Sequence, residues 1–224
     1  MGKTQKIGNA TIMNVDCMEY MRTLPDKFFD LAIVDPPYGI GMDRGKIGID
    51  GTAKANNYLK KDWDGFAPTH EYFNELTRVS KNQIIWGANH FADALPCPKS
   101  PCWIVWDKEK VGGLFADSEL AWTSFKTVVR NFKYQWHGML QGDMKNKEAR
   151  IHPTQKPVKL YEWILTNYAN PGQSIFDSHM GSGSSAIACN NLGFEYVGCE
   201  LDEDYYNAAC ERIAKHAQQE RLFD

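Results

Sequence analysis

Residues 29–38 decide the fold, and they run Phe29-Asp30-Leu31-Ala32-Ile33-Val34-Asp35-Pro36-Pro37-Tyr38. The first six are mostly apolar strand formers, a pattern typical of a parallel strand buried on both faces. Two consecutive prolines end that strand and fix φ, so a stiff turn follows it. Open α/β sheets hold their ligands at such strand ends. One carboxylate, backbone carbonyls and one aromatic ring there suit a flat ring that carries an amine. The alternative is an ordinary proline turn, because four-residue patterns recur by chance.

Length and composition favour a single soluble domain over residues 1–224. The chain is 43% hydrophobic and 24% charged, which is ordinary for a globular protein. No apolar run approaches the roughly 18 residues of a membrane span, and no apolar core follows Met1–Lys6 as in a signal peptide. The six cysteines form neither a C-x-x-C pair nor a zinc-spaced cluster. We therefore expect a cytoplasmic protein with reduced thiols, no metal site and no membrane contact.

The net charge of −3 is unevenly distributed along the chain. Residues 1–40 carry −1, residues 41–159 carry +5 and residues 160–224 carry −7. A positive middle segment fits a polyanion bound on one face. An unevenly charged, solvated surface explains the same numbers. Within that segment, residues 41–61 are rich in glycine and lysine, which predicts a mobile loop next to the site.

Strand-like runs recur along the chain, with helical patterns between several of them. The predicted strands are Ala10–Val15, Phe29–Val34, Gln83–Trp86, Trp103–Trp106, Glu119–Phe125, Ser174–Phe176 and Glu195–Cys199. Helical stripes of apolar residues cover 72–79, 160–168, 186–190 and 206–217. This alternation predicts an α/β fold with a doubly wound, mainly parallel sheet and helices on both faces.

A second binding turn follows the strand at 174–176. Residues 174–183 give a short strand, a glycine turn and the start of a helix, and glycines let a backbone approach a ligand closely. The next strand ends at Glu200, where a carboxylate usually grips a ribose diol. A nucleoside-bearing cofactor is therefore expected. A dinucleotide-dependent dehydrogenase is the first rival, but its glycine turn usually opens the chain, and it leaves Asp35–Tyr38 unexplained.

Together these motifs resemble the amino-group DNA methyltransferases that use S-adenosylmethionine, in the β arrangement of their motifs. The resemblance is carried by Asp16, Asp35-Pro36-Pro37-Tyr38, His152-Pro153-Thr154-Gln155-Lys156-Pro157, Asp177 with Gly181-Ser182-Gly183, and Glu200-Leu201-Asp202. It implies a seven-stranded, Rossmann-like sheet with circularly permuted motifs. In that sheet 10–15 and 29–34 would be strands three and four, and 174–176 and 195–199 would be strands one and two. It also implies a variable target-recognition region over about 108–150.

The resemblance implies roles for individual residues. Asp35 would accept one N–H of the target amino group, the Pro36 carbonyl would accept the other, Pro37 would stiffen the turn and Tyr38 would stack on the base. The cofactor set would be Asp16, Cys17, Thr154, Lys156, Asp177, His179, Gly181, Ser182, Gly183, Glu200, Leu201 and Asp202. The family usually has Phe at the position of His179, so we expect this imidazole to pack rather than to catalyse.

The implied substrate is duplex DNA, whose target base must flip out of the helix to react. Candidate phosphate contacts are Arg44, Lys46, Arg130, Lys133 and Arg150. Asp35 at the first motif position favours adenine N6 over cytosine N4. The remaining alternatives are an RNA or protein-glutamine methyltransferase and a DNA-binding module without activity. A homodimer and a cognate restriction nuclease are compatible partners, and the recognition sequence is not encoded in these motifs.

Overall fold

The computed structural model describes residues 2–40, 65, 67–95, 97, 99–110, 116–137 and 139–220. Its strands are β1 (Thr4–Ile7), β2 (Ala10–Met13), β3 (Phe29–Val34), β4 (Ser80–Trp86), β5 (Trp103–Asp107), β6 (Ser118–Thr123), β7 (Arg130–Lys133), β8 (Trp136–His137), β9 (Leu140–Gln141), β10 (Ser174–Asp177) and β11 (Glu195–Cys199). Its helices are α1 (Cys17–Arg22), α2 (His70–Val79), α3 (Val158–Tyr168), α4 (Ser184–Leu192) and α5 (Glu203–Glu220), with 3-10 turns η1 (Ala88–His90) and η2 (Ala92–Ala94).

One sheet dominates the described chain, with strand order β1-β2-β11-β10-β3-β4-β6-β5-β7. Strands β2, β11, β10, β3 and β4 are parallel neighbours, whereas β6 runs antiparallel to both β4 and β5. The order β2-β11-β10-β3 confirms the expected permutation: β2 and β3 take the places of strands three and four of the family's sheet, and β10 and β11, late in the chain, take the places of strands one and two. The expected seven strands form the centre, and β1 and β7 extend its two edges.

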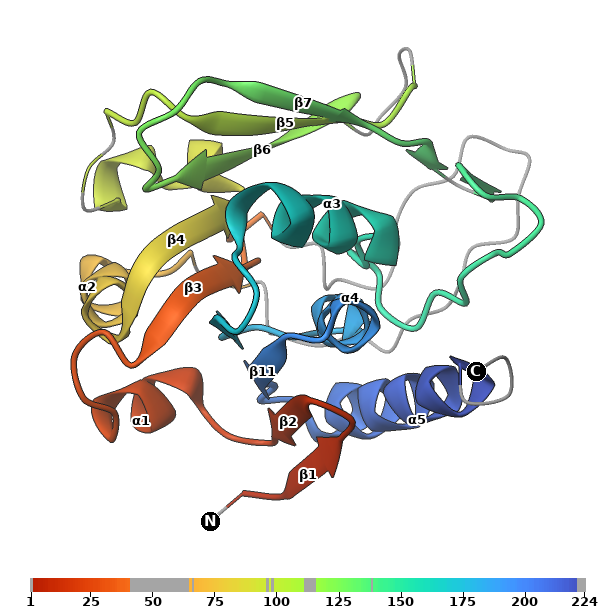
Figure 1. The fold of residues 1–224 in the computed structure, drawn as a ribbon. Coiled ribbons are helices and arrows are strands. Elements are labelled where there is room, and N and C mark those ends of the chain that lie inside the picture. The colour runs from red at the N-terminus through yellow and green to blue at the C-terminus, as the bar shows by residue number, and fades with distance from the viewer. Residues whose placement is uncertain are drawn as a thin grey trace.

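Helices cover both faces of this sheet (Figure 1). Alternating side chains of β3 explain why both faces are apolar: Leu31 and Ile33 join one core, and Ala32 and Val34 join the other. Helices α3, α4 and α5 pack on the first core, and α1 and α2 pack on the second. The predicted doubly wound α/β architecture is therefore confirmed.

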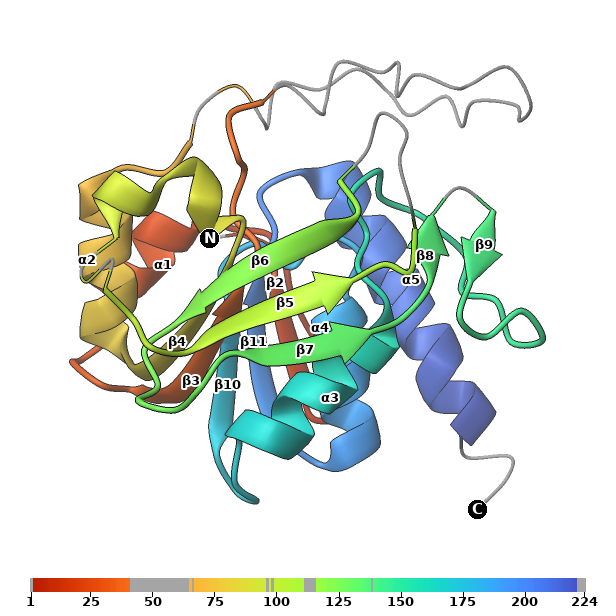
Figure 2. The same cartoon turned by 90° about the horizontal axis from the view of Figure 1, so that it is seen from above.

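Several segments within residues 108–150 belong to the main sheet. Strand β6 lies between β4 and β5, and β7 pairs with β5 at the edge. Seen from above, β6, β5 and β7 run side by side, and the chain then leaves the sheet for β8 and β9 (Figure 2). The small β8–β9 ladder is separate from the main sheet. No helix within the described residues is both long and apolar enough to cross a membrane.

Candidate active site

A cavity of about 750 Å³ opens at the carboxyl ends of β3, β10 and β11. Asp35 and Pro37 from the proline turn line it, and Gly181 and Glu200 from the far side line it too. The two turns that the sequence singled out therefore share one cavity. Its other expected residues are Asp16, Cys17, Thr154, Lys156, His179, Ser182, Leu201 and Asp202. Four expected residues are not in its wall: Pro36, Tyr38, Asp177 and Gly183.

The Asp35 carboxylate is held by two side chains. Its Oδ1 accepts a hydrogen bond from the Tyr38 hydroxyl at 2.7 Å, and its Oδ2 accepts one from the Lys156 ammonium at 2.5 Å. Burial raises the pKa of Asp35, and the ammonium of Lys156 opposes that rise. A carboxylate has about four acceptor positions, so two such bonds leave room for a further donor. Asp35 can still accept an N–H from a ligand in the cavity.

Tyr38 packs beside the proline turn, between His90 and Gly87. Its ring stacks on His90, with ring centroids 4.9 Å apart and planes 17° apart, outside the cavity wall. The ring fits there because Gly87 follows β4 with φ +69°, and a Cβ at that position would lie 2.0 Å from the Tyr38 ring. In this structure Tyr38 supports Asp35 through its hydroxyl, and its stacking on a target base stays a prediction.

Asp177 supports the glycine turn from below. Its buried carboxylate accepts hydrogen bonds from the Ser185 hydroxyl at 2.7 Å and the His179 backbone N–H at 3.1 Å. Burial raises the pKa of Asp177 to about 7. Gly183 is the N-cap of α4 with φ +74°, and a Cβ there would lie 2.7 Å from Ile213 of α5. Both residues shape the turn rather than its cavity surface.

Glu200 joins the end of β11 to the glycine turn. One carboxylate oxygen accepts the Gly181 N–H and the other accepts the Asp202 N–H, each at 2.9 Å. Burial raises the pKa of Glu200 to about 7 despite these two bonds. The carboxylate also faces the cavity, where its remaining acceptor positions can receive hydroxyl groups.

His179 is part of a buried polar chain with α2. Its Nδ1 lies 2.8 Å from the Ser178 hydroxyl, which lies 2.6 Å from the Tyr72 hydroxyl, and the His179 and Tyr72 rings meet edge to face at 5.4 Å. Burial lowers the pKa of His179 to about 4, so the imidazole is neutral at physiological pH. This geometry supports the expected packing role. Tyr72, which sequence reasoning assigned only to the core, lines the cavity.

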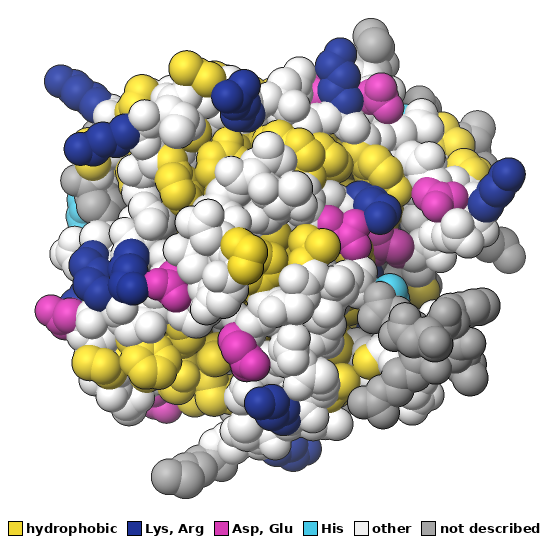
Figure 3. All heavy atoms as spheres, viewed as in Figure 1, with side chains coloured by type: hydrophobic (Ala, Val, Ile, Leu, Met, Phe, Trp, Pro, Cys, Tyr) yellow, Lys and Arg dark blue, Asp and Glu magenta, His cyan; other side chains and the backbone are white. Residues whose placement is uncertain are grey.

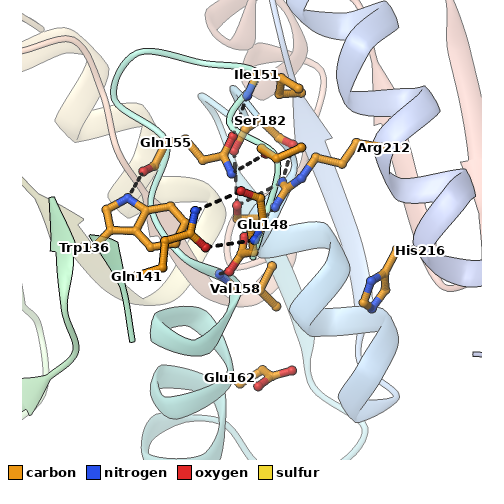
Figure 4. A network of polar contacts seen from close by, with 12 residues as sticks. Trp136, Gln141, Glu148, Ile151, Gln155, Val158, Glu162, Ser182, Arg212 and His216 are labelled. Carbon is orange, nitrogen blue, oxygen red and sulfur yellow. Dashed lines mark hydrogen bonds and ion pairs between the residues drawn. The ribbon is translucent and has the colours of Figure 1, made fainter. Parts of the chain in front are cut away.

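The turn at 152–157 is held from both sides. The His152 Nδ1 accepts the Thr154 N–H at 3.3 Å within the turn. Figure 4 shows a polar network beneath this turn, in which Arg212 of α5 binds the Ser182 carbonyl and the Glu148 carboxylate, both at 2.7 Å. Glu148 and Arg212 were missed by sequence reasoning because each lies outside the motifs. They tie the glycine turn to the segment that precedes His152.

Lys156 lines the cavity, and its ammonium contacts Asp35 and, at 3.2 Å, Glu119 of β6. Burial would lower the pKa of Lys156, but these two carboxylates raise it above its usual value. The expected place of Lys156 near the carboxylate of the cofactor stays a prediction. Glu119 was expected only as a strand residue.

The candidate DNA contacts that the structure describes lie in different parts of the molecule. Arg44 and Lys46 lie outside the described residues. Lys133 lies at the carboxyl end of β7, on the same side as the cavity, and is 3.8 Å from Asp107, whereas Arg130 lies at the amino end of that strand. The Arg150 guanidinium packs over the Trp136 ring at 4.4 Å. On the face seen in Figure 3, Lys and Arg side chains are spread among acidic ones.

Comparison with known proteins identifies the family. A family model described as DNA methylase, of the N6/N4 methyltransferases, matches residues 98–211, just over half of the chain. The chain belongs to this DNA methylase family. Among curated relatives, the type II methyltransferase M1.MboII of Moraxella bovis is 24% identical, spanning 88% of this chain and 94% of its own. The type II methyltransferase M.HinfI of Haemophilus influenzae is 23% identical, spanning 91% and 68%.

Solved structures share the fold of this methylase. The M1.HpyAVI–SAM complex matches with a TM-score of 0.56 and 22% identity, covering 91% of this chain and 99% of that one. The cytosine-N4-specific PvuII DNA methyltransferase matches with a TM-score of 0.61 and 11% identity, covering 94% and 92%. At these identities the likeness extends to the fold alone.

Proposed function

We propose that this protein is a site-specific DNA methyltransferase that moves a methyl group from S-adenosylmethionine to the N6 amino group of an adenine flipped out of duplex DNA. The observation that carries the proposal is that Asp35 and Glu200, from two turns 165 residues apart in the sequence, line one cavity. One turn suits an amine on a flat ring, and the other suits a nucleoside.

The cavity's donor set fits S-adenosylmethionine. Its volume of about 750 Å³ is within the range usual for small-molecule sites. Glu200 would hold the ribose hydroxyls, Asp16 and Cys17 would approach the adenine, and Gly181 and Ser182 would line the methionine portion. Burial and the neighbouring Asp16 raise the pKa of Cys17 to about 12, so it presents a neutral thiol to the ring. When bound, the cofactor supplies a methyl group activated by a sulfonium.

Asp35 would supply the chemistry on the substrate side. An adenine amino nitrogen is a poor nucleophile because its lone pair is delocalised into the ring. Acceptors at Asp35 and the Pro36 carbonyl would hold its two N–H groups and leave the lone pair aimed at the methyl. The transfer then needs positioning and electrostatics, with no covalent enzyme intermediate. The proton released from nitrogen leaves to water.

The type II methyltransferase relatives support site-specific modification, and the Asp at position 35 favours adenine as the target base. The test is nucleoside mass spectrometry of unmethylated duplex DNA after incubation with the protein and isotopically labelled S-adenosylmethionine. The proposal expects labelled N6-methyldeoxyadenosine, and none with Asp35→Asn. Labelled N4-methyldeoxycytidine would reassign the base. Label in RNA but not in DNA, or no transfer at all, would refute the proposal.

A further inference from the structure

Four charged side chains of alternating sign lie in a chain that ends at Asp35. Lys108, directly after β5, contacts Glu119 of β6 at 2.5 Å. Glu119 contacts Lys156 at 3.2 Å, and Lys156 contacts Asp35 at 2.5 Å. The four side chains are only 14%, 23%, 4% and 16% exposed. This quartet (Lys108, Glu119, Lys156 and Asp35) carries no net charge when all four members are ionised.

The outer pair of the quartet has no contact with the cavity. Asp35 and Lys156 line it, but Lys108 and Glu119 do not. The direction of the strands explains how these two residues reach the site. Strand β6 runs antiparallel between β4 and β5, so the start of β6, with Glu119, and the end of β5, before Lys108, lie on the side of the sheet where β3 ends before Asp35. Glu119 therefore affects the charge state of Asp35 through their shared partner Lys156 or by direct electrostatic interaction.

A buried ion needs compensation, because the cost of removing a charge from water often exceeds the attraction of a single partner. Lys156 has two carboxylate partners, and Glu119 has two ammonium partners. Removing either outer member would leave an odd charge a few ångströms from Asp35. We propose that Glu119 and Lys108 are positioning residues that complete a neutral quartet, so that the Lys156 ammonium can lie on Asp35 without leaving a net positive charge where the target amino group reacts.

This inference rests on the proposed function for the role of Asp35 as amino-group acceptor. Positive charge develops on the amino nitrogen during methyl transfer, so a surplus cation beside Asp35 would oppose the reaction. Glu119 raises the pKa of Asp35 after the larger effect of burial, and Lys156 lowers it. Although burial alone would raise the pKa of Glu119, Lys156 and Lys108 lower it to about 2, so its charge persists at any physiological pH. Other titratable groups facing the quartet are Tyr38, Tyr161, Asp177 and His152.

The signs of the expected effects separate charge balance from simple structural support. Glu119→Gln leaves a net positive cluster, which should lower the titration midpoint of Asp35 by roughly one pH unit. Lys108→Met leaves a net negative cluster, which should raise that midpoint by a similar amount. The double variant Glu119→Gln/Lys108→Met is neutral again, so its midpoint should return toward that of the wild type.

The experiment measures the Asp35 carboxyl by carbon NMR in protein labelled at aspartate, with the resonance assigned by its loss in Asp35→Asn. Single-turnover methyl transfer to DNA is followed from pH 5 to 9 in the same variants. Glu119→Gln should slow transfer roughly tenfold at neutral pH, the equivalent of one unit of pKa in free energy, and the double variant should recover. Glu119→Asp keeps the charge and should stay near wild type, as should Glu109→Gln, which removes an exposed carboxylate in the neighbouring turn.

Two results would overturn the inference. Midpoints that move in the same direction in both single variants would point to general disruption, and a double variant worse than either single one would do the same. The NMR measurement uses the free protein, so it decides the charge balance even if no substrate is methylated. Absence of transfer by the wild-type protein would refute the proposed function, independently of the midpoints.

Discussion

Asp177→Asn tests whether the carboxylate beneath the glycine turn is held in a costly, buried state. Asp177 is 1% exposed, and burial raises its pKa to about 7. An unfolded chain releases this proton near pH 4. Because the folded pKa lies above the unfolded one, the proton stabilises the folded protein below about pH 4, and that stabilisation is lost as the pH rises through 7. A difference of about three pKa units corresponds to about 4 kcal/mol in the free energy of unfolding.

Asparagine should keep the local hydrogen bonds without this titration. Its carbonyl can accept the His179 N–H, and its amide can donate to the Ser185 oxygen, since the Ser185 hydroxyl lies 2.9 Å from the Tyr196 hydroxyl as an alternative partner. The stability of Asp177→Asn relative to wild type should therefore increase by about 4 kcal/mol between pH 4 and pH 8. Urea unfolding followed by tryptophan fluorescence at several pH values measures this difference, and titrations that Asp177 does not influence cancel.

Asp30→Asn is the matched control, because its effect has the opposite sign. Lys81 and Ser174 hold the pKa of Asp30 below its usual value. The wild type should therefore gain stability relative to Asp30→Asn as the pH rises through the range where that carboxyl ionises. The reasoning fails if the stability difference between Asp177→Asn and wild type is independent of pH, or if it falls as the pH rises.

Three further predictions address the cofactor turn and the DNA surface. Glu200→Gln replaces an acceptor of a backbone N–H by an amide donor. The Kd for S-adenosylmethionine should therefore rise roughly 10- to 100-fold, since a charged hydrogen bond contributes about 1.5–3 kcal/mol. An unchanged Kd by calorimetry would remove Glu200 from the cofactor site. Gly183→Ala should lower the free energy of unfolding by about 1–3 kcal/mol more than Gly193→Ala does. Both glycines have φ +74°, but only Gly183 lacks space for a Cβ. Equal unfolding midpoints of the two variants would contradict the close packing at Gly183. Lys133→Gln should reduce the salt slope of DNA binding by about 0.9, whereas Arg130→Gln, at the other end of strand β7, should not. The reverse pattern would place DNA at the amino ends of the parallel strands.

Much of the fold was predictable because its strongest signals are local. Strands β3 and β11 appear with the predicted bounds, since apolar runs that end in Pro or at a charged turn define both limits. The short edge strands β1 and β7 were missed. Their residues are mostly exposed and carry no apolar alternation, so only pairing with a neighbouring strand makes them strands.

The sequence could predict which residues lie near the site, but not the directions in which their side chains point. The cavity contains both motif turns, as the motif order implies. The direction of the Tyr38 side chain depends on Gly87, which lies 49 residues later in the sequence, directly after β4. The sheet places Gly87 beside the Tyr38 ring. Glu119 reaches Lys156 only because β6 inserts between β4 and β5, a strand order that no local pattern encodes. Arg130 and Lys133 looked equivalent in sequence, yet they lie at opposite ends of strand β7, and only Lys133 is at the carboxyl ends of the parallel strands, where the cavity opens.

The most direct test of the central claim is a crystal structure of this protein with S-adenosylhomocysteine, the product left after methyl transfer. The account predicts ligand density in the cavity between Pro37 and Gly181, with ribose hydroxyls on the Glu200 carboxylate and the sulfur facing Asp35. Density outside this cavity, or inside it with the sulfur turned away from the proline turn, would contradict the claim that the two turns form one methyl-transfer site.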